Sequence, residues 1–143
     1  MQAELYLFLA LCLGGGLGAM ARAVVSERVA RRLHPAWGTL VVNMTGCFLL
    51  GVALGLLVGR TGAVPLSAVI AQTPPSAAVF MLGVLGGYTT VSTLALNVLT
   101  QWQAGHRRAA YANALGSVLS GPLVVALGVV IGARAFVPWL AGG

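Results

Sequence analysis

Apolar residues fill almost the whole chain, and the few charged positions divide it into long apolar stretches. These stretches cover residues 4–25, 32–60, 76–102 and 109–133. A helix that crosses a bilayer needs roughly 20 apolar residues in succession. The pattern therefore predicts four membrane helices, and an even number of spans places both chain termini on the same side.

Polar residues and helix breakers mark the expected connections. The segment 27–35 carries Glu27, three arginines, His34 and Pro35, which predicts a polar loop. The segment 61–75 contains Gly62 and three prolines, which interrupt helices, and predicts a loop with room for an interfacial turn. Trp37 lies at the start of the second stretch, where an aromatic ring suits the membrane interface, and Trp139 lies beyond the end of the fourth.

The composition agrees with a membrane protein. Hydrophobic residues make up 59% of the chain and charged residues 7%, whereas about a quarter of the residues in soluble domains are charged. We expect an all-α membrane protein with a single four-helix transmembrane domain over residues 1–143. The apolar segment 5–13 lacks the basic residues that precede a signal-peptide core, so we expect it to remain as the first membrane helix. The net charge of +6 comes from widely spaced arginines, so nucleic-acid binding is not predicted.

The middle of the third stretch is unusual for a membrane helix. Two adjacent glycines, Gly86 and Gly87, lie at bilayer depth beside five hydroxyl side chains: Tyr88, Thr89, Thr90, Ser92 and Thr93. Glycine weakens a helix, and unsatisfied backbone in lipid is costly, so a break at Gly86–Gly87 is tolerated only in a protein interior or at an ion site. Broken helices at ion sites offer freed carbonyls to cations and helix N-termini to anions. The alternative is an unbroken helix with a hydroxyl-rich packing face.

Other small residues have a packing interpretation. Glycines recur at four-residue spacing, as Gly14 and Gly18, Gly51, Gly55 and Gly59, Gly83 and Gly87, and Gly128 and Gly132. This spacing favours close helix contact and indicates no function. The two cysteines, Cys12 and Cys47, lie in apolar runs without a metal-ligand partner, and we interpret both as buried small hydrophobic residues.

The polar residues do not indicate an enzyme. The only carboxylates, Glu4 and Glu27, lie outside the middle of the spans, and both histidines lie in expected loops. Acid–base catalysis and metal catalysis are therefore not predicted. The spans instead carry one cation and several uncharged polar side chains: Arg22, Thr39, Asn43, Thr45, Ser92, Thr93, Asn113, Ser117 and Ser120. Donors without a membrane carboxylate favour an anion and disfavour proton-coupled export.

Each of these polar residues also has a structural interpretation. Arg22 could extend to the lipid headgroups, and Asn43 could form a hydrogen bond between helices. Ser117 and Ser120 could satisfy their hydroxyls on their own helix backbone. Their joint occurrence favours a functional role.

Three motifs carry a family resemblance. They read Gly15-x-x-Gly18-Ala19-x-x-Arg22, Gly38-Thr39-Leu40-x-Val42-Asn43-x-x-Gly46-x-Phe48-x-x-Gly51 and Gly86-Gly87-Tyr88-Thr89-Thr90-x-Ser92-Thr93. In this order they resemble the fluoride channel family called Fluc or CrcB. The resemblance implies an antiparallel, dual-topology dimer with a pair of fluoride pores and a central structural sodium ion.

The resemblance also implies roles for individual residues. Backbone carbonyls of Gly86 and Thr89 would hold the sodium ion, and Arg22 would lie at the vestibule. The implied fluoride pore consists of Asn43, Ser92, Thr93, Ser117 and Thr39. The chain departs from the family pattern at Val91 and Leu94, where phenylalanines are usual, and at Asn113, where many members have tyrosine. An aromatic edge is electropositive and can contact an anion, whereas an alkyl group cannot, so these departures put the usual pore chemistry in doubt.

The function implied is passive, fluoride-selective export through a multi-pass protein of the inner (plasma) membrane. One alternative is a subunit of a two-gene heterodimeric channel in which a paralogue completes the degenerate pore. Alternatives from another class are a small proton-coupled exporter and a purely structural membrane subunit.

Arginines are distributed unequally between the two ends of the expected bundle. Five lie in the loops after the first and third helices and two, Arg60 and Arg134, at the other end. Positive charge favours the cytoplasmic side, which predicts that both termini lie outside. A dual-topology homodimer should show almost no bias, so we expect either weakly dual insertion or an oppositely oriented paralogue.

Overall fold

The structure is a computed structural model that describes residues 2–33, 35–61 and 66–141. Every regular element in these ranges is a helix. Four helical segments are long and apolar enough to cross a membrane: Gln2–Ala30, Ala36–Arg60, Pro75–Gln103 and Arg107–Ala135. The predicted four-span, all-α architecture is confirmed.

Some helix ends differ from the prediction. Helix α1 (Gln2–Ala30) continues through part of the expected polar loop, and Arg31 just beyond it donates a hydrogen bond to Glu27 at 2.7 Å. Such a pair four residues apart supports a last helical turn. The segment expected as a loop contains a short helix, α3 (Leu66–Ala71), while residues 62–65, like His34, lie outside the described residues.

The fourth span is longer than expected. Helix α7 (Arg107–Ala141) passes Ala133, the predicted end, so position 139 lies within a helix; the side chain of Trp139 lies outside the described residues.

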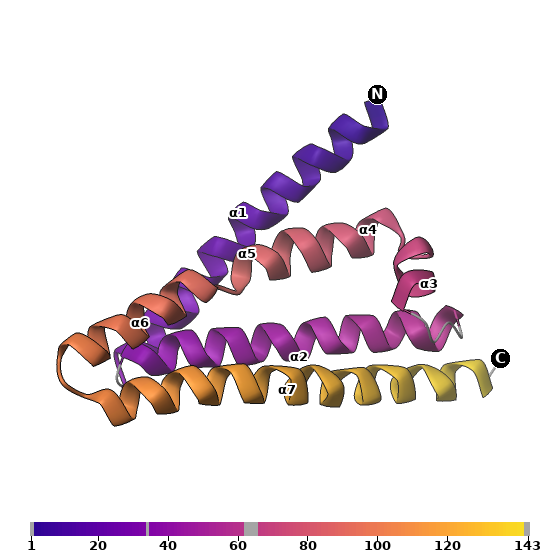
Figure 1. Cartoon of the computed structure of the whole chain (residues 1–143). Coiled ribbons are helices and arrows are strands. Elements are labelled where there is room, and N and C mark those ends of the chain that lie inside the picture. Colours follow the sequence, from indigo (N-terminus) through magenta and orange to yellow (C-terminus); the bar gives the residue numbers. More distant parts are fainter. Residues whose placement is uncertain (1, 34, 62–65, 142–143) are drawn as a thin grey trace.

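Helices α2 (Pro35–Thr61) and α7 lie side by side along most of their length (Figure 1). Glycines on both helices make this approach possible. A Cβ atom at Gly51 or Gly55 would overlap the backbone of α7, and a Cβ atom at Gly128 or Gly132 would overlap the backbone of α2. The prediction that glycines at this spacing support close packing is confirmed for these helices.

The third span consists of two halves with different neighbours. Its first half contains α4 (Pro75–Ala78), the π-helix η1 (Val79–Leu85) and the single turn α5 (Gly86–Tyr88), and it packs against α1. Glycines again lie at the contact, with Gly18 against Val84 and Gly87 against Gly15. The second half, α6 (Val91–Gln103), packs against α7.

The predicted break near the middle of the third span is confirmed, and it begins two residues after the Gly86–Gly87 pair, at Thr89. Gly86 has helical backbone angles (φ −64°, ψ −39°), and α5 continues through Tyr88. The chain becomes extended only at Thr89 (φ −80°, ψ 155°) and Thr90 (φ −152°, ψ 125°). The hydrogen bonds described below explain why the interruption follows the glycines.

A tight turn joins α6 to α7 at the end of the bundle where α1 also connects to α2 (Figure 1). Gly105 adopts a positive φ of 81° there, which side chains disfavour. Beside the turn, Trp102 and Tyr111 pack edge to face with ring centroids 5.4 Å apart. The Arg107 guanidinium carbon lies 5.3 Å from the Trp102 ring centroid. Both termini point toward the opposite end of the bundle (Figure 1).

Candidate functional site

Asn43 on α2 pairs with the backbone of the break. Its Nδ2 donates to the Thr90 carbonyl oxygen at 2.9 Å, and the Thr90 amide donates to Asn43 Oδ1 at 2.9 Å. The side-chain amide thus replaces a neighbouring peptide group, which satisfies backbone that would be costly in a membrane. The interpretation of Asn43 as an interhelical hydrogen-bonding residue is confirmed. One of its two N–H groups has no partner among the described residues.

Thr90 organises the start of α6. The Thr93 amide donates to Thr90 Oγ1 at 3.2 Å, and the hydroxyls of Ser92 and Thr93 lie 3.0 and 3.2 Å from that oxygen. Thr90 is therefore the N-cap of α6, and three hydroxyls gather at a helix N-terminus, where a negative ion is favoured. Thr90 is not among the site residues predicted from the sequence. The available signal was a threonine with a second polar side chain three residues later, the spacing of a capping box.

The same hydrogen bonds free two backbone carbonyls. In a continuous helix each amide donates to the carbonyl four residues earlier. The Thr90 amide would then donate to the Gly86 carbonyl, and the Thr93 amide to the Thr89 carbonyl. Here the Thr90 amide donates to Asn43, and the Thr93 amide donates to the Thr90 hydroxyl. Within the described part of the chain, the Gly86 and Thr89 carbonyls thus lose their helical donors. These are the carbonyls that the family resemblance implies as sodium ligands.

A cavity of about 390 Å³ lies beside the break. Its lining includes Asn43, Gly86, Thr89, Val91, Leu94 and Ser117. Ser117 is only 8% exposed, and its hydroxyl has no hydrogen-bond partner among the described residues. The interpretation that Ser117 satisfies itself on its own helix is wrong, whereas Ser120 does donate to the Gly116 carbonyl at 2.5 Å. Ser117 thus brings to the cavity lining a buried hydroxyl that is unpaired among the described residues.

Polar pairs continue from the break toward the α6–α7 turn. Asn97, one turn after Thr93 on α6, donates to the buried Thr39 hydroxyl at 2.9 Å. One turn further along, Gln101 Oε1 and Asn113 Nδ2 are 3.5 Å apart. Asn97 and Gln101 are not among the predicted site residues, although they follow Thr93 at intervals of four residues, which places all three on one helix face.

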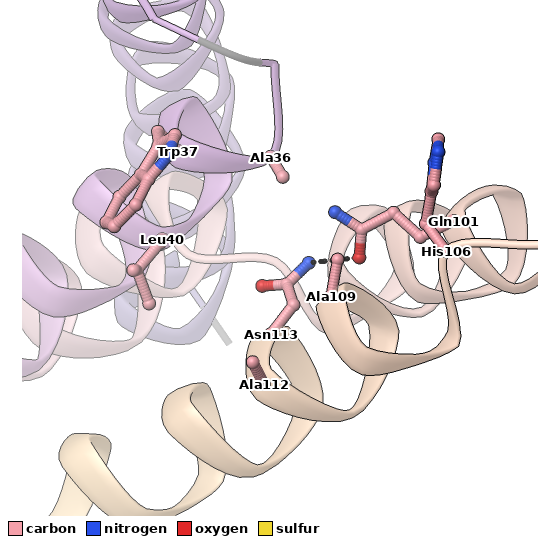
Figure 2. Close-up of a pocket in the computed structure, with 8 residues that line it drawn as sticks. All are labelled: Ala36, Trp37, Leu40, Gln101, His106, Ala109, Ala112 and Asn113. Carbon is pink, nitrogen blue, oxygen red and sulfur yellow. Dashed lines mark hydrogen bonds between the residues drawn. The ribbon is translucent and has the colours of Figure 1, made fainter.

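The outermost of these pairs lines a second cavity of about 330 Å³. Figure 2 shows Gln101 and Asn113 facing one another, with Trp37 and Leu40 contributing the wall from α2. His106, in the turn before α7, also lines it. The two cavities thus lie along α2, α6 and α7, and on α6 Asn97 stands between Leu94, which lines one cavity, and Gln101, which lines the other.

The remaining expected site residues lie as follows. Arg22 is half-buried on α1 and makes no hydrogen bond with the described residues, so its vestibule role stays a prediction. Val91 is 79% exposed and Leu94 half-buried, and both line the cavity beside the break.

Cys47 also lines that cavity, whereas Cys12 is exposed on α1. The interpretation of Cys12 as buried is wrong, because no described residue covers that face of α1.

Comparison with known proteins identifies the family. The family model described as "CrcB-like protein, Camphor Resistance (CrcB)" matches residues 9–129. The chain belongs to the CrcB-like family. The resemblance carried by the sequence motifs is confirmed, and the CrcB-like match covers most of all four spans.

Several CrcB-like relatives match most of the chain. A protein of Paracoccus denitrificans named Fluoride-specific ion channel FluC is 38% identical over 132 residues, which cover 90% of this chain and 96% of the relative. A protein of Magnetococcus marinus with the same name is 39% identical, covering 84% and 92%. A protein of Brucella suis named Fluoride-specific ion channel FluC 3 is 38% identical, covering 80% and 83%. These relatives are ion channels by name, and this CrcB-like chain is a multi-pass membrane protein.

Proposed function

We propose that this protein is a passive, fluoride-selective channel of the bacterial inner membrane and not an enzyme. One observation carries the proposal. The cavity beside the break contains two donors that are not fully engaged, the second N–H of Asn43 and the buried hydroxyl of Ser117. Fluoride is small and strongly hydrated, so a pore must replace its water with firm donors. The names of the relatives support the same ion.

The proposed fluoride path follows the uncharged polar residues. Asn43 and Ser117 contact the ion in the cavity, and the hydroxyls of Ser92 and Thr93 favour it at the N-terminus of α6. The buried Thr39, which accepts a hydrogen bond from Asn97, continues this polar series toward the α6–α7 turn, and Arg22 attracts the anion at the vestibule. Because these membrane donors other than Arg22 carry no charge, they stabilise fluoride without holding it as a buried fixed charge would.

We further propose a structural sodium ion at the centre of a dimer. The carbonyls of Gly86 and Thr89, which lose their helical donors at the break, are the ligands that each subunit supplies. Carbonyl oxygens without carboxylates suit a monovalent cation better than a divalent one. When bound, the ion supplies positive charge that offsets the converging carbonyl dipoles.

The proposed assembly is an antiparallel dimer in the lipid bilayer, formed by two copies of this chain. A dimer with an oppositely oriented paralogue is the second candidate, and two observations favour it. Some relatives carry numbered names, such as FluC 3 of Brucella suis. The arginine distribution of this chain also favours a single orientation, with both termini outside.

Fluoride efflux from liposomes that contain only this protein tests the proposal. We expect fluoride to leave and chloride to stay, with no dependence on a proton gradient. Efflux of neither ion from the single protein, followed by fluoride efflux after co-reconstitution with a paralogue, would support the heterodimer. Efflux that requires a proton gradient would contradict a passive channel.

A further inference from the structure

We propose that Asn43 is a positioning residue that creates the cation site, in addition to its role as a donor in the pore. This inference rests on the proposed structural sodium ion. The Asn43 side chain would then affect both the cation at the centre of the channel and the fluoride path beside it. The two sites are linked by the hydrogen bond that the Thr90 amide donates to Asn43 Oδ1.

The first step is a competition for that amide. The Thr90 N–H can donate either to Gly86, which would continue α5 into α6, or to a group outside the third span. Asn43 Oδ1 accepts it at 2.9 Å, so the Gly86 carbonyl is released. Without Asn43, the most accessible partner for this amide in a dry environment is the Gly86 carbonyl, because an unpaired N–H in lipid costs several kcal/mol. Loss of Asn43 therefore removes a ligand from the proposed cation site.

The second step concerns the orientation of the Asn43 amide. Oδ1 and Nδ2 both bond to Thr90, at 2.9 Å each, which fixes the plane of the carboxamide. A pair of this kind uses the N–H on the same side as the oxygen, so the other N–H points away from Thr90. Since Asn43 lines the cavity, the bond that frees the Gly86 carbonyl also holds a donor in a fixed direction for fluoride.

Helix α2 also holds the break on both sides. Thr45 Oγ1 lies 3.0 Å from the Tyr88 hydroxyl, just before the break, and Asn43 bonds to Thr90, just after it. Gly46 allows this approach, because a Cβ atom there would overlap the Thr89 side chain. The two segments are therefore held apart by α2 rather than by flexible glycines.

The test distinguishes the role of Asn43 Oδ1 as an acceptor for the Thr90 amide from the role of Nδ2 as a donor. Asn43→Asp keeps an acceptor for the Thr90 amide and removes the donors, whereas Asn43→Leu removes both. The readout is thermal stability of the purified channel as sodium chloride replaces N-methyl-D-glucamine chloride, because a ligand that binds only the folded state raises its melting temperature with concentration. Fluoride efflux is measured in parallel.

We expect the wild type to be stabilised by sodium and Asn43→Leu to need at least tenfold more sodium for half of that stabilisation. Asn43→Asp should need no more sodium than the wild type while its fluoride efflux falls. Ser120→Ala is the matched control, since it removes a different polar contact of α2, the one between Met44 and Ser120 of α7, and leaves the hydrogen bonds between Asn43 and Thr90 in place. It should keep the sodium response of the wild type.

Two results would overturn the inference in distinguishable ways. If the wild type responds to sodium and Asn43→Leu responds equally well, the positioning role is wrong and the sodium site stands. If the wild type shows no response to sodium, the sodium site fails and the positioning role fails with it. Should Asn43→Leu not yield folded protein, Asn43→Ser replaces it, because serine is smaller and ends short of the Thr90 backbone.

Discussion

The α2–α7 pair and the third span are both rich in glycine, yet only the third span is interrupted. In the α2–α7 pair, Gly51 and Gly128 lie where the two backbones meet, and both helices continue past them. In the third span, Gly87 lies against Gly15 in the same manner, and the helix continues for another residue. Glycine thus permits close approach in both regions, and it breaks the helix in neither.

The costs of a helical glycine and of an unsatisfied backbone group explain why only the third span is interrupted. A glycine inside a helix costs about 1 kcal/mol relative to alanine, whereas an unsatisfied backbone group in lipid costs several kcal/mol. A membrane helix therefore opens only where another group replaces its hydrogen bonds. Asn43 and the Thr90 hydroxyl provide that replacement in the third span. Along α2 and α7, the described residues provide no comparable polar pair with the backbone of the partner helix.

The largest expected effect follows from filling the α2–α7 contact. In Gly128→Leu, the new side chain would overlap the Phe48 carbonyl and the Val52 amide. Overpacking of this kind typically costs about 1–3 kcal/mol and more where backbone cannot move, so we expect loss of folded, monodisperse protein in size-exclusion chromatography. Gly116→Leu is the control, since no atom lies within 4 Å of its Cβ position. Equal behaviour of both variants would contradict the packing role of glycine in this pair.

The next effect concerns the start of α6, where Val91 and Leu94 stand in place of the expected phenylalanines. Val91→Phe combined with Leu94→Phe places two ring edges beside the cavity, worth about 1–3 kcal/mol together, which corresponds to roughly tenfold to hundredfold faster fluoride efflux. Leu96→Phe on the same helix adds a ring that does not line this cavity and should leave efflux unchanged. A double variant no faster than the wild type would favour a pore completed by a paralogue.

A smaller effect is expected from chemical modification of the cavity wall on α2. A negatively charged methanethiosulfonate reagent should reduce fluoride efflux several-fold by attaching to Cys47, which lines the cavity. Cys47→Ser should abolish the inhibition, and Cys12→Ser should preserve it, because Cys12 lies on an exposed face of α1. Inhibition that depends on Cys12 instead would place the fluoride path outside this cavity.

The smallest effect separates the two adjacent glycines. Gly86→Ala meets no atom within 4 Å and has helical backbone angles, so its free energy of unfolding in detergent should change by less than about 0.5 kcal/mol. Gly87→Ala would overlap the Gly15 carbonyl and should destabilise the protein by about 1–3 kcal/mol. If both variants were equally harmful, the glycine pair and not Asn43 would determine the break.

The sequence predicted the features that depend on composition and spacing. Charge positions located the four spans, and glycine spacing located the contacts of Gly14, Gly51 and Gly128. The position of the break could not be found in this way, because it depends on a hydrogen bond between residues 47 positions apart in the chain. The pairing of Thr39 with Asn97 is equally nonlocal. A sequence pattern shows that an asparagine lies in a membrane helix, but not which backbone it contacts.

The division of the third span has a consequence for the synthesis of the protein. Its first half packs against α1, which leaves the ribosome early, whereas α6 packs against α7, which leaves last. Ser117 belongs to α7, so the cavity beside the break lacks a wall until the final helix is inserted. An incomplete nascent chain therefore contains the residues of the break but no enclosed route for an ion. On the proposed function, the ion path is complete only once α7 is inserted.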